Sequence, residues 1–495
     1  MAETTTTVEP RLARGLRDLL PEQMLPRQWM IDTIRKVFEL YGFVPLYTSA
    51  IEFLDVLSGS AGEEAQRSIF KVSNPDRGAT LGAPLGLRFD QTVPLARVVA
   101  QYAGLQRPFR CYQVASVWRA DKPGKGRFRE FTQFDLDSVG VVSEVADTEI
   151  IAGMCDTLSA LDVGAYRVRF SSRTLLNLLL VYAGISEEQG MDVFRVLDKL
   201  EKMGIEKVRM ELTSGYTDHS GDEITGLGLS TQQVEKIDHF LAISPYGSGE
   251  GGRQEILRNR NEIIDQLRDL FASVPKASEE IDLVGQISRH LYALGYGDDR
   301  AVLDLSIARG LAYYTGPVFE AVLLDAPEYG SVFGGGRYDD LVMRFLGEPV
   351  PATGASMGVD RLLAALVDLG KVGHRKATAQ VLVLNMDPAL IDDYLAMTYE
   401  LRRAGIRTEF YLGTEKRIGH QLKYADRCNV PISLLFGSNE KEQGTVTLKD
   451  MEMGRRKAEK LSGREQWIKE RPGQREVPRA ELASAIQALL AQIET

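Results

Sequence analysis

The stretch RFREFTQFDLDSVG, residues 127–140, alternates two sets of side chains with a spacing of two residues. This spacing is typical of a β-strand, because successive side chains of a strand point to opposite faces. One face carries Gln133, Asp135 and Asp137 and is therefore polar and charged. The strand-like segment CYQVASVWRA (111–120) precedes it, and ADKPGKG (120–126) supplies the Pro and Gly of a turn. The pattern predicts a hairpin with a cationic tip.

Strand patterns recur on both sides of this hairpin and predict a sheet assembled from distant parts of the chain. LGLRFD (85–90) lies before it, and residues 302–325 and SVFGGGRYDDLV (331–342) lie far behind it. TGASMGVDRLLAALVDLG (353–370) is interpreted as a Gly-rich turn that leads into a helix. Two segments have the apolar spacing of helices, namely 26–41 (Met30, Ile34, Val37, Phe38 and Tyr41) and 145–162.

The remaining regions suggest an insertion and a separate domain. Residues 171–300 are mostly helical in pattern and predict an inserted helical region. Within it, GSGEGG (247–252) matches GxGxxG, but a dinucleotide site needs a preceding strand and the preceding residues have a helical pattern, so a connector is favoured. Residues 379–454 alternate strand, helix, strand, helix, strand, which predicts a small domain with a largely parallel sheet. Residues 455–475 predict an exposed charged loop before a closing helix.

Composition narrows the class of protein. The chain has 495 residues, of which 44% are hydrophobic and 26% charged, as in ordinary globular proteins. At roughly 150 residues per domain, its length predicts about three domains. No apolar run approaches the ~18 residues of a membrane span, and the N-terminus has no apolar signal core. The three cysteines lie far apart and no HxxxH or HxH occurs, so we expect no disulfide framework or metal site and a cytoplasmic location.

The net charge of −10 argues against a general nucleic-acid binder. A nucleic-acid partner would need local basic patches, and two exist, at 119–130 and 441–480. The chain contains no GxSxG, HExxH or GxxxxGK[ST] motif. This pattern suits a phosphoryl-group transfer in which the substrate supplies the nucleophile and the protein supplies positioning and charge.

Arginines beside small polar residues are the most informative feature. In LRFDQT, we expect Arg88, Asp90 and Thr92 to share one face of a strand. Other arginines stand at strands or at the start of a helix, namely Arg119, Arg309 and Arg361. Each taken alone is explained equally well by a surface salt bridge. Together they suggest a polyphosphate held over a sheet, because a buried guanidinium must be paired, and the neighbouring Asp and Thr suit an ammonium group.

Four motifs carry a resemblance to a known family. RFREFTQFDLD (127–137) and GASMGVDRLL (354–363) resemble the second and third motifs of the class II aminoacyl-tRNA synthetases. RGLAYYTGPVFE (309–320) and GGGRYDDL (334–341) resemble two signatures peculiar to the histidyl-tRNA synthetases. RGLRDLLPEQM near the start and the 379–454 unit also match. The resemblance covers nearly the whole chain and is loose over 171–300.

The resemblance implies an α+β catalytic core, with the class II antiparallel sheet flanked by helices. It also implies a helical insertion and a C-terminal α/β anticodon-binding domain. The expected division is 1–170 for the first part of the core with motifs 1 and 2, 171–300 for the insertion, 301–370 for the second part of the core, and 379–495 for the anticodon-binding domain.

The implied activity is the ATP-dependent ligation of L-histidine to tRNA(His) through a histidyl-adenylate. The implied partners are L-histidine, ATP and tRNA(His), and a homodimer without membrane contact is expected. Mg²⁺ would be carried by the ATP phosphates, with no permanent cofactor and no protein-built metal site.

The family also implies roles for individual residues. The histidine α-amino group would be held by Asp90, Thr92 and Gln133. The imidazole would be read by Asp137 and Tyr314, in a pocket shaped by Tyr313 and Tyr338. A carboxylate and a tyrosine hydroxyl together satisfy either protonation state of an imidazole.

For ATP, the implied ligands are Arg119 at the α-phosphate and Arg127 and Arg361 at the γ-phosphate. Arg309 would lie between the histidine carboxylate and the α-phosphate, where negative charge builds as the carboxylate attacks. Arg119 and Arg309 are therefore the expected catalytic residues.

The chain departs from the family pattern at a few positions. Ala312 replaces an acidic residue, Ser49 stands where motif 1 usually has proline, and Asp90 and Asp137 stand where many relatives have glutamate.

Three alternatives compete with this interpretation. A histidine-sensing regulatory subunit of ATP phosphoribosyltransferase shares the core but generally lacks the C-terminal domain and has eroded ATP-binding arginines. A class II synthetase of the glycine, proline or threonine group shares the C-terminal domain but not the two histidine signatures. A tRNA-binding module without catalysis would not need the phosphate arginines.

Overall fold

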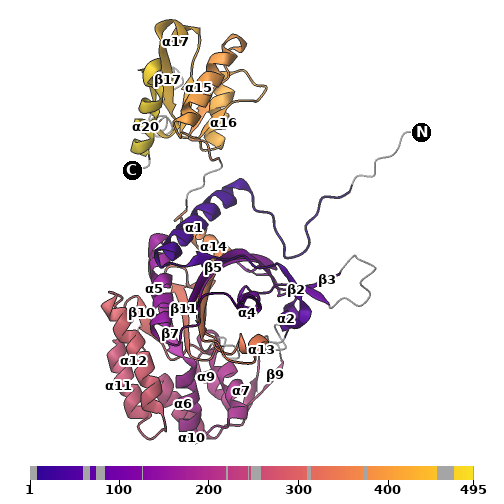
Figure 1. The fold of residues 1–495 in the computed structure, drawn as a ribbon, viewed down its shortest axis with the longest axis vertical. Helices are drawn as coiled ribbons and strands as arrows, with labels where there is room; N and C mark the ends of the chain where they lie inside the picture. Colours follow the sequence, from indigo (N-terminus) through magenta and orange to yellow (C-terminus); the bar gives the residue numbers. More distant parts are fainter. Residues whose placement is uncertain are drawn as a thin grey trace, which may run out of the picture. The chain divides into compact units, whose positions relative to one another are not determined.

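The computed structural model describes residues 8–58, 67–73, 84–124, 126–218, 221–243, 245–246, 258–308, 314–372, 377–453 and 473–493. The chain forms two compact units. The first combines Met1–Arg17 with Trp29–Lys371, and the second combines Asp18–Gln28 with Val372–Thr495 (Figure 1). The GSGEGG segment and residues 454–472 of the predicted charged loop lie outside the described residues.

An eight-stranded sheet forms the centre of the first unit. Its strands, in spatial order, are β1 (Val44–Pro45), β5 (Phe109–Trp118), β6 (Glu130–Val139), β13 (Ala352–Gly358), β12 (Ser331–Arg337), β11 (Pro317–Leu323), β7 (Tyr166–Ser172) and β10 (Ala301–Leu303). The pairs from β5 to β7 are antiparallel, and only the edge pairs β1–β5 and β7–β10 are parallel. The predicted hairpin is β5–β6, and the predicted antiparallel core is confirmed.

Helices α1 (Pro21–Leu40) and α5 (Val145–Ala160) lie against the apolar face of β6. The predicted core residues Met30, Ile34, Val37 and Phe38 of α1 are all buried. The Phe38 ring meets the Phe134 ring of β6 edge-on, with the ring centroids 5.1 Å apart. Because side chains alternate along β6, the helices cover one face and leave Gln133, Asp135 and Asp137 on the other.

The prediction that Arg88, Asp90 and Thr92 share a strand is wrong. The strand β4 ends at Leu87 (Leu85–Leu87) and pairs with β2 (Ile51–Phe53) and β3 (Lys71–Val72) in a small separate sheet. Thr92 instead begins α4 (Thr92–Gln101), and the Asp90 carboxylate accepts a hydrogen bond from Val93 N–H at 3.1 Å. An acidic side chain that caps the first turn favours a helix at this point. The alternation of residue types in LRFDQT suggested a strand and concealed this helix-start signal.

Arg88 is a structural residue rather than a phosphate ligand. Its side chain is 2% exposed and donates to the carbonyl oxygens of Ser116 and Thr48 at 2.9 and 2.7 Å. These bonds satisfy the buried guanidinium and tie the segment after β4 to β5.

The segment interpreted as a Gly-rich turn is also different in the structure, because residues 352–358 form the central strand β13. Gly354 pairs with Asp137 of β6, and a Cβ on Gly354 would lie 1.9 Å from Asp137 Oδ1. Glycine is therefore required by close packing between strands rather than by a turn. The predicted helix does follow, as α14 (Val359–Asp368).

Most of the region between β7 and β10 is helical. Its helices are α6 (Arg173–Ala183), α7 (Glu187–Leu197), α8 (Leu200–Met203), α9 (Ile205–Leu212), α10 (Thr231–Leu241), α11 (Arg260–Leu270) and α12 (Ala277–Ala293), and a short hairpin joins β8 (Gly215–Thr217) to β9 (Glu223–Thr225). Figure 1 shows α11 and α12 side by side. Arg169 on β7 forms ion pairs with Glu320 on β11 and with Glu201 on α8, which ties this region to the sheet.

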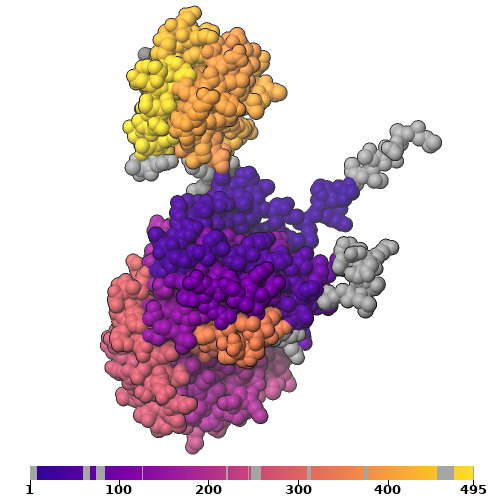
Figure 2. Space-filling view, viewed as in Figure 1, coloured from indigo at the N-terminus to yellow at the C-terminus, as the bar shows by residue number. Residues whose placement is uncertain are grey.

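Segments far apart in the chain meet on the face of the first unit shown in Figure 2. There the orange segment around α13 (Met343–Leu346) lies beside purple segments from the first hundred residues. Arg344 of α13 donates to the carbonyl oxygens of Asp55 and Val56 in α2 (Leu54–Ser58).

The second unit is a five-stranded sheet covered by helices. In spatial order its strands are β15 (Thr408–Phe410), β14 (Val381–Val383), β16 (Ile432–Leu435), β17 (Thr445–Asp450) and β18 (Gln474–Pro478). The first three are parallel, as predicted, whereas β17 and β18 are antiparallel. The main helices are α15 (Ile391–Arg403), α16 (Ile418–Arg427), α17 (Ser438–Gln443) and α20 (Leu482–Ile493).

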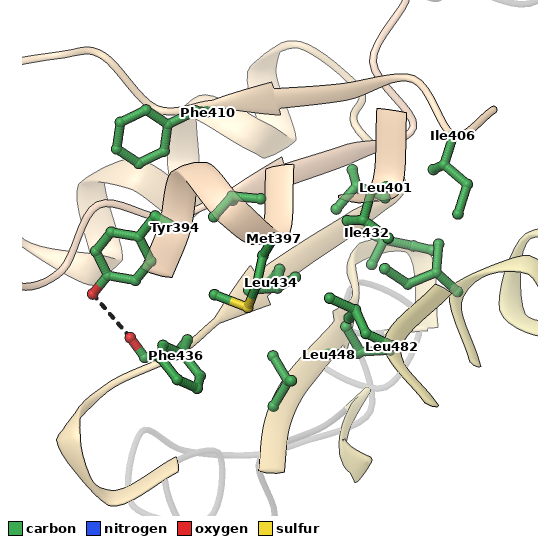
Figure 3. Packing of buried hydrophobic residues seen from close by; sticks show 14 of the residues in the cluster. Tyr394, Met397, Leu401, Ile406, Phe410, Ile432, Leu434, Phe436, Leu448 and Leu482 are labelled. Atoms are coloured by element: carbon green, nitrogen blue, oxygen red, sulfur yellow. Dashed lines mark hydrogen bonds between the residues drawn. The ribbon is translucent and has the colours of Figure 1, made fainter. Parts of the chain in front are cut away.

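Two clusters of buried apolar residues hold this unit together, and Figure 3 shows the larger of them. Tyr394 and Met397 of α15 pack with Leu434, Leu448 and Leu482, all of them buried. The Tyr394 hydroxyl donates to the carbonyl oxygen of Phe436 at 2.9 Å, so the one polar tip in this part of the core has a partner.

No helix among the described residues has the length and apolar character needed to cross a bilayer. No cluster of three or more His, Cys, Asp or Glu side chains among them is arranged to hold a metal ion.

Candidate active site

The polar face of β6 is the floor of the site. Gln133, Asp135 and Asp137 follow one another at alternate positions on this face. The neighbouring strand β13 brings Gly354 and Ser356 beside them. Since one of these strands carries two carboxyl groups and the other has small residues, the surface above them is hollow and lined by acidic side chains.

The larger of two adjoining pockets has a volume of about 310 Å³. Five predicted site residues line it, namely Arg119, Arg127, Gln133, Tyr314 and Arg361. They come from different elements, because Arg119 follows β5, Arg127 precedes β6 and Arg361 lies in the first turn of α14. The structure thus brings three arginines predicted for ATP into one cavity.

The smaller pocket, of about 20 Å³, lies over Asp135 and Asp137. Its lining includes four predicted residues, namely Thr92, Asp137, Tyr314 and Tyr338. Tyr314, Gly334 and Ser356 line both pockets, so the two cavities adjoin there.

Asp137 is 2% exposed and only partly satisfied. The Tyr338 hydroxyl donates to its Oδ1 at 2.6 Å, whereas its Oδ2 has no hydrogen-bond partner among the described residues. Burial raises the pKa of Asp137 to about 7, against the effect of the Tyr338 hydrogen bond, which lowers it. A buried oxygen of this kind is ready to accept a hydrogen bond from a ligand.

Asp90 lies next to these residues but lines neither pocket. Burial raises its pKa to about 6, while the Val93 N–H and the charge of Arg119 lower it. Arg119 itself donates through Nε to the Phe89 carbonyl oxygen at 2.9 Å, and its guanidinium carbon lies 5.2 Å from the centroid of the Phe131 ring. Its charge also lowers the pKa of Asp135 and Tyr314 against the larger, raising effect of burial. Arg119 therefore lines the larger pocket, and its charge acts on the acidic residues around the smaller one.

Two predicted residues cannot be placed. Arg309 and Tyr313 fall in 309–313, outside the described residues, as does the departure at Ala312.

Asp135 is a site residue that the sequence analysis did not single out. It lines the smaller pocket and is 1% exposed. Ser356 Oγ donates to its Oδ1, and Ser356 in turn accepts from Gln133 Nε2 at 2.8 Å. The alternation along β6 already placed Asp135 on the polar face between Gln133 and Asp137. This pattern could have identified Asp135 as a site residue from the sequence.

Arg17 was also missed. Its Nη2 donates to Asp360 Oδ1 at 2.6 Å, and its guanidinium carbon lies 3.7 Å from the centroid of the Phe128 ring. Asp360 Oδ2 accepts from Thr132 N–H at 2.5 Å. Because Phe128 and Asp360 line the larger pocket, Arg17 holds two residues of that lining in place.

Comparisons with known proteins agree with this arrangement. The family model described as Histidyl-tRNA synthetase matches residues 15–245 and 250–362, and the model described as Anticodon binding domain matches 380–489. The Histidine--tRNA ligase of Cereibacter sphaeroides is 42% identical, over 99% of this chain and 100% of that protein. The protein of the same name from Paracoccus denitrificans is 42% identical over 96% and 97%. The crystal structure of histidyl-tRNA synthetase from Nostoc sp. PCC 7120 superimposes with a TM-score of 0.79 at 29% identity, covering 97% of this chain and all of that one.

Proposed function

This chain belongs to the histidyl-tRNA synthetase family, and we propose that it ligates L-histidine to tRNA(His) through a histidyl-adenylate made from ATP. One observation carries the proposal. A pocket lined by three arginines adjoins an acidic pocket at Tyr314, so a triphosphate and an amino acid with basic nitrogens can lie side by side.

We place the histidine ring over Asp137. Oδ2 of Asp137 and the hydroxyl of Tyr314 would be the acceptor and donor for the two ring nitrogens, and Tyr338 fixes the carboxylate. Tyr313 is proposed from the family pattern alone to help shape the pocket. Asp90, Thr92 and Gln133 would hold the α-amino group. The roles of Asp90 and Tyr313 are supported by the family pattern alone. The roles of the other residues are supported by their places in the lining of the two adjoining pockets.

In the first step, an oxygen of the histidine carboxylate attacks the α-phosphorus of ATP and pyrophosphate leaves. The substrate supplies the nucleophile, so the protein's task is to align it and to offset the charge that develops. Arg119 lines the larger pocket and would serve this purpose, with Arg309 as its proposed second cation. Arg127 and Arg361 would bind the γ-phosphate, and Mg²⁺ would come with the phosphates.

In the second step, the 3′ end of tRNA takes histidine from the adenylate. We propose that residues 379–495 read the anticodon, with 1–170 and 301–370 as the catalytic core and 171–300 as an insertion. The family-model match over 380–489 and the separate core of the second unit support this division.

We also propose a homodimer that forms through the segment around motif 1. Several large apolar side chains are exposed there, namely Leu40, Val44, Tyr47, Ile51 and Phe53. Strand β1, in the same segment, is at the edge of the large sheet. A cluster of this kind is typical of an interface. The cytoplasmic location stays a prediction from the cysteine usage.

The regulatory-subunit alternative has less support. Three of the phosphate arginines are present and share a pocket, and the anticodon-binding domain is present. The relatives that match over nearly their full length are histidine–tRNA ligases.

The direct test is pyrophosphate exchange. Purified protein with ATP, Mg²⁺ and labelled pyrophosphate is expected to form labelled ATP only when L-histidine is added, because the acidic pocket selects an imidazole. Parallel reactions with threonine, proline and glycine measure selectivity. Exchange with one of these and none with histidine would contradict the proposal.

A second test addresses the anticodon. A tRNA(His) transcript with a replaced anticodon is expected to be charged with a kcat/KM lower by about 10- to 100-fold, since contacts to unpaired bases contribute on the order of 1–3 kcal/mol each. Pyrophosphate exchange, which needs no tRNA, is the control and should not change. Equal charging of both transcripts would argue against anticodon reading by this chain.

A further inference from the structure

Three carboxylates gather around the smaller pocket, more than the imidazole requires. Burial raises the pKa of Asp135 well above its usual range, and the nearby charges of Asp137 and Asp90 raise it further. Arg119 is the cation whose charge offsets them. Ionised carboxylates only accept hydrogen bonds, so a ligand with several N–H donors fits this acidic lining.

Besides Asp137 Oδ2, two more buried acceptors on β6 have no partner among the described residues. One is Asp135 Oδ2 and the other is Gln133 Oε1. Ser356 connects their side chains, because it accepts from Gln133 Nε2 and donates to Asp135 Oδ1. These two hydrogen bonds fix the orientation of both side chains. Asp135 Oδ2 and Gln133 Oε1 are left as acceptors for a ligand. Unpaired buried acceptors cost free energy, which a ligand donor would recover.

The order of these residues along β6 indicates which group of the ligand donates to Asp135. Asp135 lies two residues, about 6.7 Å, from both Gln133 and Asp137. The ring has only two nitrogens, which Asp137 and Tyr314 satisfy in the proposed function. An ammonium group donates three hydrogen bonds, and the position between Gln133 and Asp137 is where the α-carbon end of a histidine would lie.

We propose that Asp135 is a further substrate-binding residue, whose Oδ2 accepts an N–H from the ammonium group of L-histidine beside Gln133. This inference rests on the proposed function and deepens it. A bound ammonium group favours the ionised form of Asp135, against the effect of burial. The floor of the site then offers a charged acceptor to the α-amino group, in addition to Asp90 and Thr92 at the start of α4.

The experiment compares two ligands by calorimetry on the full chain. L-histidine has the ammonium group, and 3-(imidazol-4-yl)propionate lacks it but keeps the ring. Asp135→Asn is expected to weaken L-histidine binding by about 10-fold or more, the scale of a hydrogen bond to a charged group, and to leave the analogue within about 2-fold. Asp162→Asn, at an exposed position, is the matched control and should change neither.

Every outcome decides the question. Equal weakening of both ligands by Asp135→Asn would place Asp135 at the ring, and no weakening would remove it from the site, so either result overturns the inference. If Asp135→Asn does not fold, Ser356→Ala replaces it, because it leaves the carboxylate but frees it to rotate. Ser356→Ala is expected to lower the affinity for L-histidine by a few-fold and to leave the affinity for the analogue unchanged. An equal change in the two affinities, or no change in either, would again overturn the inference. Wild-type protein that binds no L-histidine would instead contradict the proposed function.

Discussion

Arg119→Ala is expected to slow histidine-dependent pyrophosphate exchange by about 10³-fold, the scale found when a cation or donor at a developing charge is removed. Arg119 lines the larger pocket, and its charge reaches Asp90, Asp135 and Tyr314 around the smaller one. Without the guanidinium group of Arg119, the negative charge that develops as the histidine carboxylate attacks the α-phosphate of ATP is no longer offset. The measurement is kcat/KM for exchange at saturating ATP.

The matched control for this variant is Arg119→Lys, which keeps the charge but not the planar fork. It should retain more activity than Arg119→Ala. The alanine variant should also lose more activity at pH 6 than at pH 8. Removing the cation raises the pKa of Asp90 above about 6, so that more of this carboxyl is protonated at the lower pH. Exchange within about 2-fold of wild type, with no new pH dependence, would remove Arg119 from the mechanism.

Asp137→Ala is expected to raise the KM for histidine by about 10²- to 10³-fold, because truncating one partner of a buried, hydrogen-bonded charged contact costs on the order of 2–5 kcal/mol. The variant removes the acceptor for the imidazole and leaves the buried Tyr338 hydroxyl without its partner. The readout is the KM for histidine and the KM for ATP in the same exchange assay.

The KM for ATP is the internal control, since Asp137 lines the smaller pocket and not the arginine-lined one. It should change by less than about 3-fold if the two pockets bind separate substrates. A parallel rise in both constants would mean a general loss of structure, and an unchanged KM for histidine would exclude Asp137 as the ring ligand.

The alternation of residues 127–140 was sufficient to predict the strand on which the site is built. Its polar face lines the two adjoining pockets, and its apolar face is covered by α1 and α5. Four of the five periodic residues predicted for 26–41 are buried in α1, because burial of one helix face is a local pattern, whereas Tyr41 follows the end of the helix and is half-buried.

Other features depend on contacts between distant segments and could not be predicted in this way. Gly354 suggested a turn, yet it is a strand residue whose missing Cβ makes room for Asp137, more than 200 positions away in sequence. LRFDQT alternates like a strand, yet α4 begins at Thr92 and the Asp90 carboxylate accepts from Val93 N–H in its first turn. Arg17 has no pattern of its own, since its role arises from Asp360 and Phe128.

The missed role of Asp135 has a different cause. The family pattern directs attention to positions that relatives share, and Asp135 is recognised only when its free oxygen and its bond from Ser356 are seen together. A pattern of residue types does not distinguish a carboxylate that faces solvent from one that is buried and unpaired.

The most direct test of the account is a crystal structure of the full chain with a non-hydrolysable histidyl-adenylate analogue, such as the sulfamoyl adenosine of histidine. We predict the imidazole at Asp137, the ammonium group between Gln133 and Asp135, and the sulfamoyl group at Arg119, with the adenosine in the arginine-lined pocket. Density for the analogue elsewhere, or an imidazole outside hydrogen-bond distance of Asp137, would contradict the claim that the two pockets adjoining at Tyr314 form one active site.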